Sequence, residues 1–83
     1  MSHNIVISPA QCKAGRNLLS WTQEDLKVYS SVSANTIATF EKGSRSLTIK
    51  TMEKLVDAFY QHGIRFENNE KEIVVRLLLN HNL

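Results

Sequence analysis

Residues 23–43 read QEDLKVYSSVSANTIATFEKG, and this stretch decides the fold. Thr22 precedes a glutamine and two carboxylates, the pattern of an N-cap followed by acidic residues that favour the positive end of a helix dipole. Leu26 is the apolar residue on which this helix would pack. Two consecutive serines interrupt the pattern after about Tyr29, so the sequence predicts a short helix that ends there.

A second short helix follows the serine pair. Ser33 is its predicted N-cap, and Val32, Ile37 and Phe40 are spaced so that they form one buried stripe. Gly43 lies where the end of a helix tolerates a left-handed backbone. The residues left facing outward are Ala34, Asn35, Ala38 and Thr39. Two helices joined by a turn of three or four residues form a helix-turn-helix unit.

From Ala10 to about Leu55 the chain resembles the Cro/cI-type (Xre-like) helix-turn-helix family of bacterial and phage transcriptional regulators. The matching segments, at the family's spacings, are RNLLSWTQEDL at 16–26, VSANTI at 32–37 and FEKGSR at 40–45. The tail, from Gly63 onward, is similar to a subgroup that ends in a β-hairpin. The resemblance implies a mostly α fold, with four helices of the phage-repressor type and a C-terminal β-hairpin.

Two positions depart from the family's pattern. Lys27 stands where the family usually has a small residue, at the close crossing of two helices, so its ammonium would have to reach solvent over its apolar stem. Ser31 stands in the turn where the family prefers glycine, and a serine is strained at positive φ. Both departures affect the expected crossing angle of the two helices in the helix-turn-helix unit. They leave the assignment of the motif unchanged.

Without this resemblance, the outward face of the second helix would be read as an ordinary solvated face. The resemblance implies that it reads DNA bases through Ser33, Ala34, Asn35 and Thr39. Asn35 is the expected principal reader because its amide can pair bidentately with adenine in the major groove. Thr39 could offer a hydroxyl or a methyl group to thymine, whereas Ala34 can make only apolar contact.

A second set of residues is expected at the DNA backbone, where contacts position a protein without specifying sequence. This set is Gln23, Thr36, Lys42, Ser44 and Arg45. The family counterpart of Gln23 contacts a phosphate, although a glutamine that merely favours a helix is the alternative. Residues 1–50 carry six basic and three acidic side chains, against four and five in residues 51–83. The excess of positive charge therefore lies with the half that would meet phosphates.

Arg16 lies on the predicted inner stripe of an N-terminal helix, yet arginine is seldom buried unpaired. Its family counterpart pairs with the acid of the FExG segment, which is Glu41 here. The resemblance therefore implies a structural Arg16–Glu41 ion pair, and a surface arginine is the alternative.

The other helices are predicted to form the scaffold. Ser8 and Pro9 begin a helix over about 9–19, preceded by an extended or frayed arm over 1–7. A fourth helix, over about 49–62, follows an N-cap at Thr48 and ends before Gly63. The inner faces of these two helices are expected to carry Cys12, Gly15, Arg16 and Leu19, and Met52, Leu55, Val56 and Phe59.

Residues 63–80 are predicted to form the β-hairpin, which makes 1–83 one domain with its helical core at 8–62. The second strand begins at about 72, and its stretch IVVRLLL at 73–79 is too apolar for an exposed edge strand.

This stretch either packs on the first and fourth helices or is partly buried against a second copy of the chain. A short helix over 72–81 is a further alternative.

Composition narrows the class of protein. The chain has 83 residues, a net charge of +2 and one cysteine, so no internal disulfide can form and a reducing cytosol fits. No apolar run approaches the ~18 residues needed to cross a membrane, and no signal-peptide pattern is present. His3, His62 and His81 are scattered and no glycine-rich phosphate loop exists, so we expect no metal, no cofactor and no enzymatic activity.

Cys12 reads as a small apolar side chain and Trp21 as part of the core.

The sequence thus predicts a cytoplasmic, sequence-specific regulator of transcription, a repressor, that reads double-stranded DNA in the major groove. We expect a homodimer whose interface includes the hairpin, because one reading helix contacts too few bases to specify a site. The two half-sites would lie one helical turn apart, ~34–36 Å. The alternative is a protein-interaction module, such as the antitoxin of a toxin–antitoxin pair, that holds a partner through the apolar strand at 73–79.

Overall fold

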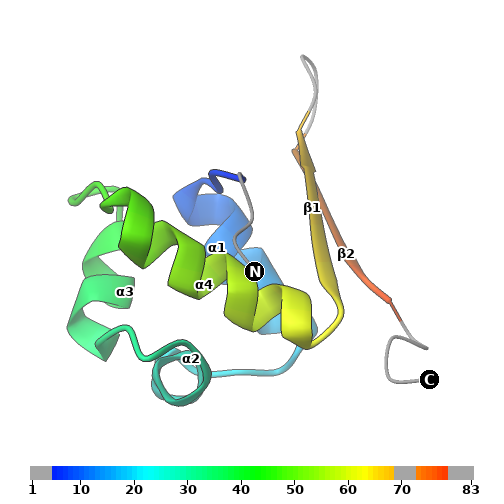
Figure 1. Ribbon diagram of the computed structural model, residues 1–83, viewed down its shortest axis with the longest axis horizontal. Coiled ribbons are helices and arrows are strands. Elements are labelled where there is room, and N and C mark those ends of the chain that lie inside the picture. Colours follow the sequence, from blue (N-terminus) through cyan, green and yellow to red (C-terminus); the bar gives the residue numbers. More distant parts are fainter. Residues whose placement is uncertain (1–4, 69–72, 79–83) are drawn as a thin grey trace.

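The computed structural model describes residues 5–68 and 73–78, which form four helices followed by two strands (Figure 1). In chain order the elements are α1 (Pro9–Leu18), α2 (Gln23–Ser30), α3 (Ala34–Glu41), α4 (Ile49–Gln61), β1 (Ile64–Asn68) and β2 (Ile73–Leu77). This is the mostly α fold with a C-terminal hairpin that the sequence predicts. Helix α3 and the hairpin lie at opposite ends of the molecule, whose longest axis measures 34 Å.

Every helix begins at a hydroxyl residue, as predicted. The four N-caps are Ser8, Thr22, Ser33 and Thr48. Each has an extended backbone, and its side-chain oxygen accepts a hydrogen bond from the backbone N–H three residues further on. In α1 and α2 the third residue reciprocates: Gln11 Oε1 accepts from Ser8 N at 2.8 Å, and Asp25 Oδ2 accepts from Thr22 N at 2.9 Å.

The turns on either side of α3 use left-handed backbone. Gly43, predicted to end α3, has φ of 81°, and Ser31 has φ of 63°. A left-handed backbone costs a residue with a side chain about 1–2 kcal/mol. Ser31 therefore adopts, at this cost, a conformation that glycine would adopt freely. The other departure from the family pattern, Lys27, keeps its ammonium at the surface, 3.5 Å from Glu24 Oε1.

The core lies between the four helices and the inner face of the hairpin. Helix α4 buries the predicted stripe of Met52, Leu55, Val56 and Phe59, together with Ala58. Leu26 from α2 and Ile37 from α3 are fully buried in the same core cluster. Helix α1 contributes Gln11, Cys12, Gly15 and Arg16, and Leu19 just beyond the helix is only partly buried.

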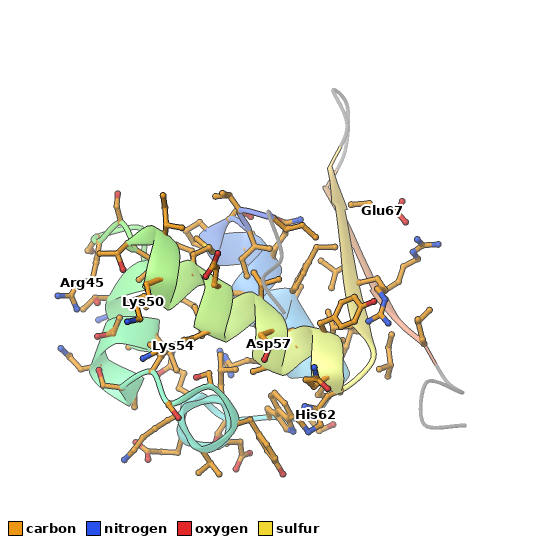
Figure 2. The ribbon with its side chains drawn as sticks, in the orientation of Figure 1. Arg45, Lys50, Lys54, Asp57, His62 and Glu67 are labelled. Carbon is orange, nitrogen blue, oxygen red and sulfur yellow. The ribbon has the colours of Figure 1, made fainter. Side chains whose placement is uncertain are left out.

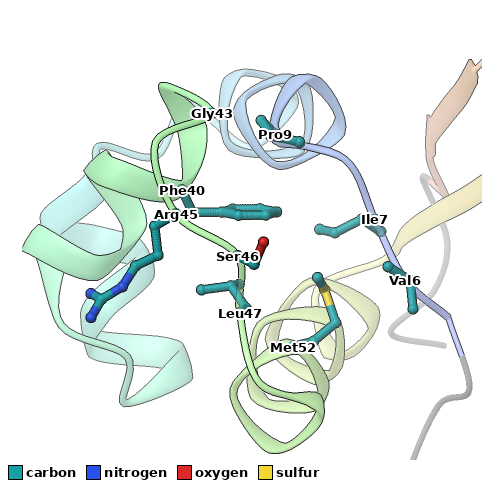
Figure 3. Close-up of a pocket in the computed structure, with 9 residues that line it drawn as sticks. All are labelled: Val6, Ile7, Pro9, Phe40, Gly43, Arg45, Ser46, Leu47 and Met52. Atoms are coloured by element: carbon teal, nitrogen blue, oxygen red, sulfur yellow. The ribbon is translucent and has the colours of Figure 1, made fainter.

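One residue of the extended or frayed arm expected over residues 1–7 is part of the core. Residues 1–4 lie outside the described residues, but Ile7 is only 2 % exposed and belongs to the core. Figure 3 shows its side chain directed toward Phe40 and Met52, across a hollow of about 290 Å³ at the edge of the core. Ile7 directly precedes the N-cap of α1, where an apolar residue commonly packs on the first turn, and this signal could have identified it.

Trp21 packs against the edge of the core and remains half-buried. Its ring stacks on Tyr29 with centroids 4.5 Å apart, and Phe59 lies behind it at 6.1 Å. The ring of His62 packs edge-on against Trp21 and Tyr29, at 4.7 and 4.5 Å. This aromatic cluster joins the α1–α2 connection to the C-terminal ends of α2 and α4.

The two strands pair antiparallel, with Ile64 opposite Leu77 and Phe66 opposite Val75. Ile64 and Phe66 are buried, and Val75 and Leu77 pack against the core. Because β2 lies on α1 and β1 on α4, the apolar face of the hairpin is covered by the chain's own helices. The helix alternative is therefore wrong for residues 73–77.

The outer face of the hairpin is charged. Arg65 lies opposite Arg76. Arg76 forms an ion pair with Glu67, and the guanidinium carbon of Arg65 lies 3.7 Å from the centroid of the Tyr60 ring. Each of the two positive charges therefore has a favourable partner. Leu78 follows β2 and is 38 % exposed. The rest of the predicted hairpin, at 69–72 and 79–80, lies outside the described residues.

Candidate nucleic-acid interface

Helix α3 presents one free amide at its surface. Asn35 is exposed, and its side chain makes no hydrogen bond to another residue within 5–68 or 73–78. Ile37 and Phe40 hold the opposite side of the helix in the core. An exposed amide that has both donors and its acceptor available can pair with the edge of a base.

The other predicted base readers are more constrained. The Ser33 hydroxyl accepts from Thr36 N at 3.1 Å and donates to Thr36 Oγ1 at 2.8 Å, so it serves first as the N-cap. Thr39 Oγ1 donates to the Asn35 carbonyl at 2.9 Å, which leaves its lone pairs and its methyl group for a partner. Ala34 is half-buried. Of the four residues, Asn35 alone combines an exposed position with unused donors.

Two of the predicted phosphate-contacting residues meet beside the N-terminal half of α3. Arg45 Nη1 donates to Thr36 Oγ1 at 3.0 Å, and Figure 3 shows the Arg45 side chain directed away from the apolar hollow. This contact restrains the guanidinium, which keeps further N–H groups for an anion. Ser44 and Lys42 are exposed near the end of α3, and Ser44 N donates to the Thr39 carbonyl at 3.0 Å.

Basic side chains gather at the α3 end of the molecule. Figure 2 shows Arg45, Lys50 and Lys54 at this end, whereas Glu67 lies at the far end on the hairpin. Lys50 and Lys54 are one turn apart on α4 and therefore share a face of that helix. The arrangement concentrates positive potential beside the proposed reading helix.

Glu41, at the end of α3, joins α1 to the helix-turn-helix unit. Its Oε1 accepts from Arg16 Nη2 at 2.7 Å and its Oε2 from Arg16 Nε at 2.8 Å, which makes the pair bidentate. The two side chains are 10 % and 5 % exposed, and Arg16 Nη1 donates to the Trp21 carbonyl at 2.9 Å. The ion pair implied by the resemblance is therefore present and largely buried.

Gln23 does not simply project toward solvent from the start of α2. Its Nε2 donates to Glu41 Oε1 at 3.2 Å, and the side chain is half-buried. The structure thus brings one predicted phosphate-contacting residue into the same network as the structural ion pair.

Cys12 is the part of this network that the sequence does not reveal. Its fully buried Sγ donates to Glu41 Oε2 at 3.2 Å, so its interpretation as a purely apolar side chain is wrong. Burial raises the pKa of the Cys12 thiol, and the hydrogen bond to the Glu41 carboxylate raises it further. The thiol consequently stays protonated and acts as a donor.

Burial alone would raise the pKa of Glu41, but the hydrogen bonds from Arg16, Cys12 and Gln23 outweigh it and hold the pKa below its ordinary value of 4.5. The same bond to Glu41 raises the pKa of Arg16. At neutral pH the carboxylate is therefore ionised and can only accept hydrogen bonds.

A polar hollow of about 420 Å³ opens beside this network, between α1, α2 and α3. Its lining consists of Lys13, Arg16, Gln23, Ala38, Glu41 and Lys42. Lys13 was not predicted as a site residue, although it lies three residues before Arg16 and therefore on the same side of α1. Lys13 and Lys42 are exposed and bring two positive charges to the rim of this polar hollow.

No group of three or more metal-binding side chains occurs among the described residues. Within the same part of the chain, every helix is too short or too polar to cross a membrane.

A family model described as helix-turn-helix matches residues 13–59, which is more than half of the chain. The chain therefore belongs to the Cro/C1-type helix-turn-helix family and is a DNA-binding regulator of that class. The C-terminal hairpin agrees with the subgroup that the sequence resembles. No curated protein matches the chain.

Proposed function

We propose that this protein is a sequence-specific transcriptional repressor that reads the major groove through α3 and works in the cytoplasm as a homodimer. The observation that carries the proposal is the exposed, unengaged amide of Asn35 in the first turn of α3. Arg45, Lys50 and Lys54 gather at the same end of the molecule as this helix. An adenine offers its N6 and N7 to such an amide in the major groove. The backbone contacts would come from Gln23, Thr36, Lys42, Ser44 and Arg45 and would position α3 without selecting a sequence.

Selection of binding sites from random duplex DNA tests this proposal. Asn35→Ala is expected to relax the preference at one base position, with a loss of about 1–3 kcal/mol of discrimination, because the bidentate contact is removed. Asn17→Ala is the matched control, since Asn17 is an exposed asparagine on α1. An unchanged consensus with Asn35→Ala would show that another residue reads the base.

Repression is the proposed outcome because a dimer bound over a promoter excludes the transcription machinery without any further activity. We propose no catalytic role. A reporter gene placed behind a selected site should be less transcribed when the protein is present, and Asn35→Ala should restore its expression. Increased transcription would make the protein an activator.

The alternative, a protein-interaction module such as an antitoxin, depended on a free apolar face of the second strand. Val75 and Leu77 pack against the chain's own core, and the outer face of the hairpin carries Arg65, Glu67 and Arg76. This observation favours the regulator over the partner-binding module.

A further inference from the structure

We propose that Glu41, itself held by Cys12 and Arg16, is a positioning residue that presents one N–H of the Gln23 amide to a DNA phosphate over the hollow beside it. The inference rests on the proposed function and deepens it. It assigns to the buried Cys12 a part in DNA binding, through Glu41.

The Glu41 carboxylate is held on both of its oxygens. Glu41 accepts four hydrogen bonds, two on each oxygen: Oε1 from Arg16 and Gln23, and Oε2 from Arg16 and Cys12. An ionised carboxylate offers about four acceptor positions in all, so its capacity is filled. Each donor therefore restrains the orientation available to the others.

The Glu41 carboxylate determines which end of the Gln23 amide faces it. An ionised Glu41 can only accept, so the Gln23 side chain must turn its NH₂ group, and not its carbonyl, toward the network. One of the two amide hydrogens is used by Glu41, and the second remains for an outside acceptor. Because Gln23 lines the polar hollow with Lys13 and Lys42, that acceptor would be an anion. A phosphate of the DNA backbone is the anion that a bound duplex brings to this side of α2 and α3.

The Cys12 thiol holds the carboxylate oxygen that Gln23 does not contact. Cys12 donates to Oε2 from a fully buried position at 3.2 Å, on the side of the carboxylate away from Gln23. Without this donor, Glu41 keeps the two bonds to Arg16 but loses its second contact on Oε2, and only Gln23 itself remains to restrain a tilt of the carboxylate out of the plane of the Arg16 pair. The amide of Gln23 then has a less well-defined acceptor and is presented to DNA in more than one orientation.

The first test uses the free protein and follows the side-chain amide of Gln23 by nuclear magnetic resonance. Cys12→Ala should shift the Gln23 amide resonances toward those of a solvated glutamine, and Cys12→Ser, which restores a donor of similar size, should return them toward the wild type. A Gln23 signal that is the same in all three proteins would overturn the inference. If Cys12→Ala lowers the folded fraction, Cys12→Val, which fills the site without a donor, takes its place.

The second test measures affinity for a selected duplex and for an unrelated one. Gln23→Ala should weaken binding to both duplexes about 10- to 100-fold, the range expected for one hydrogen bond to a charged group. Cys12→Ala should have an effect of the same kind, Cys12→Ser should bind like the wild type, and the double variant should be no weaker than Gln23→Ala alone. Neither uncharged residue releases counterions, so these variants should leave the salt dependence unchanged, whereas Lys42→Ala should reduce its slope by about one.

The outcomes separate the inference from the function on which it rests. A wild-type protein that binds no duplex DNA overturns both. If the wild type binds DNA and Cys12→Ala binds equally well, the positioning role alone is overturned. The same holds if the effects of Cys12→Ala and Gln23→Ala on binding simply add. If the role of Cys12 were merely structural, Cys12→Ala would lower the stability of the protein. Its effect on DNA affinity would then add to that of Gln23→Ala, and Cys12→Ser would not restore it.

Discussion

At the scale of single residues, the buried pair of Arg16 and Glu41 carries the largest expected energy. Breaking one partner of a buried ion pair leaves an uncompensated charge and typically costs about 3–5 kcal/mol. We therefore expect Arg16→Met and Glu41→Gln each to lower the free energy of unfolding by roughly this amount, and the double variant to lose much less than the sum of the two. Thermal unfolding of the four proteins measures the coupling energy, and a value near zero would show that the pair contributes nothing to stability.

The acid side of the stability profile gives a separate prediction for Glu41. Its pKa in the folded protein lies below the ordinary value of 4.5, so the carboxylate stabilises the fold fully above that value and progressively less as the pH falls through the folded pKa. The wild type should therefore lose stability between about pH 5 and pH 3 more steeply than Glu41→Gln. Denaturant titrations across this range provide the measurement, with the other carboxylates common to both proteins. Parallel profiles would contradict the depressed pKa.

Residue-scale features differ in how far the sequence reveals them. Arg16 and Glu41 could be paired in advance because the family motif fixes their spacing, and Asn35 could be selected by its chemistry. The hydrogen bonds of Cys12 and Gln23 to Glu41 could not, because they join residues 29 and 18 positions apart whose separation only the folded structure sets. A cysteine in an apolar stripe reads as a hydrophobe until an acceptor is found beside it.

At the scale of elements, the crossing of α1 and α4 depends on the absence of a side chain at Gly15. A Cβ atom there would lie 3.0 Å from Cε1 and 3.2 Å from Cδ1 of Phe59, a ring that is fully buried. Gly15→Ala gains up to about 1 kcal/mol of helix propensity but overpacks the crossing, which typically costs about 1–3 kcal/mol. We therefore expect thermal unfolding to show a net loss of stability of up to about 2 kcal/mol. Asn17→Ala, an exposed change in the same helix, should not lose stability, and a stabilised Gly15→Ala would show that Phe59 shifts without cost.

The elements themselves were predictable to different degrees. All four N-caps follow from the sequence because a cap is satisfied within three residues of itself. The burial of Ile7 and the covering of β2 by α1 depend on contacts between distant segments, so the sequence left the first unrecognised and the second open between alternatives.

At the scale of the whole molecule, the positions of α3 and the hairpin restrict how two copies could bind one site. The two parts lie at opposite ends of the 34 Å axis, and the molecule is 32 Å across in its second dimension. Copies joined end to end through their hairpins would set the reading helices farther apart than one turn of DNA. Copies standing side by side, with both α3 ends on the duplex and the hairpins touching above it, would place them at about the width of one molecule. That width is close to the ~34–36 Å between half-sites one helical turn apart.

We therefore predict a side-by-side dimer whose hairpins meet at Leu78, the exposed apolar residue that directly follows β2. Leu78 is therefore the residue to change. Leu78→Lys should convert a dimer in sedimentation equilibrium at micromolar concentration into a monomer and weaken binding to a two-fold site, because each copy must then bind alone. Val28→Lys is the control, since Val28 is 73 % exposed on α2, away from the hairpin, and should leave the mass unchanged. A wild type that sediments as a monomer and selects sites without two-fold symmetry would exclude the dimer, whereas selected half-sites two turns apart would contradict the side-by-side arrangement.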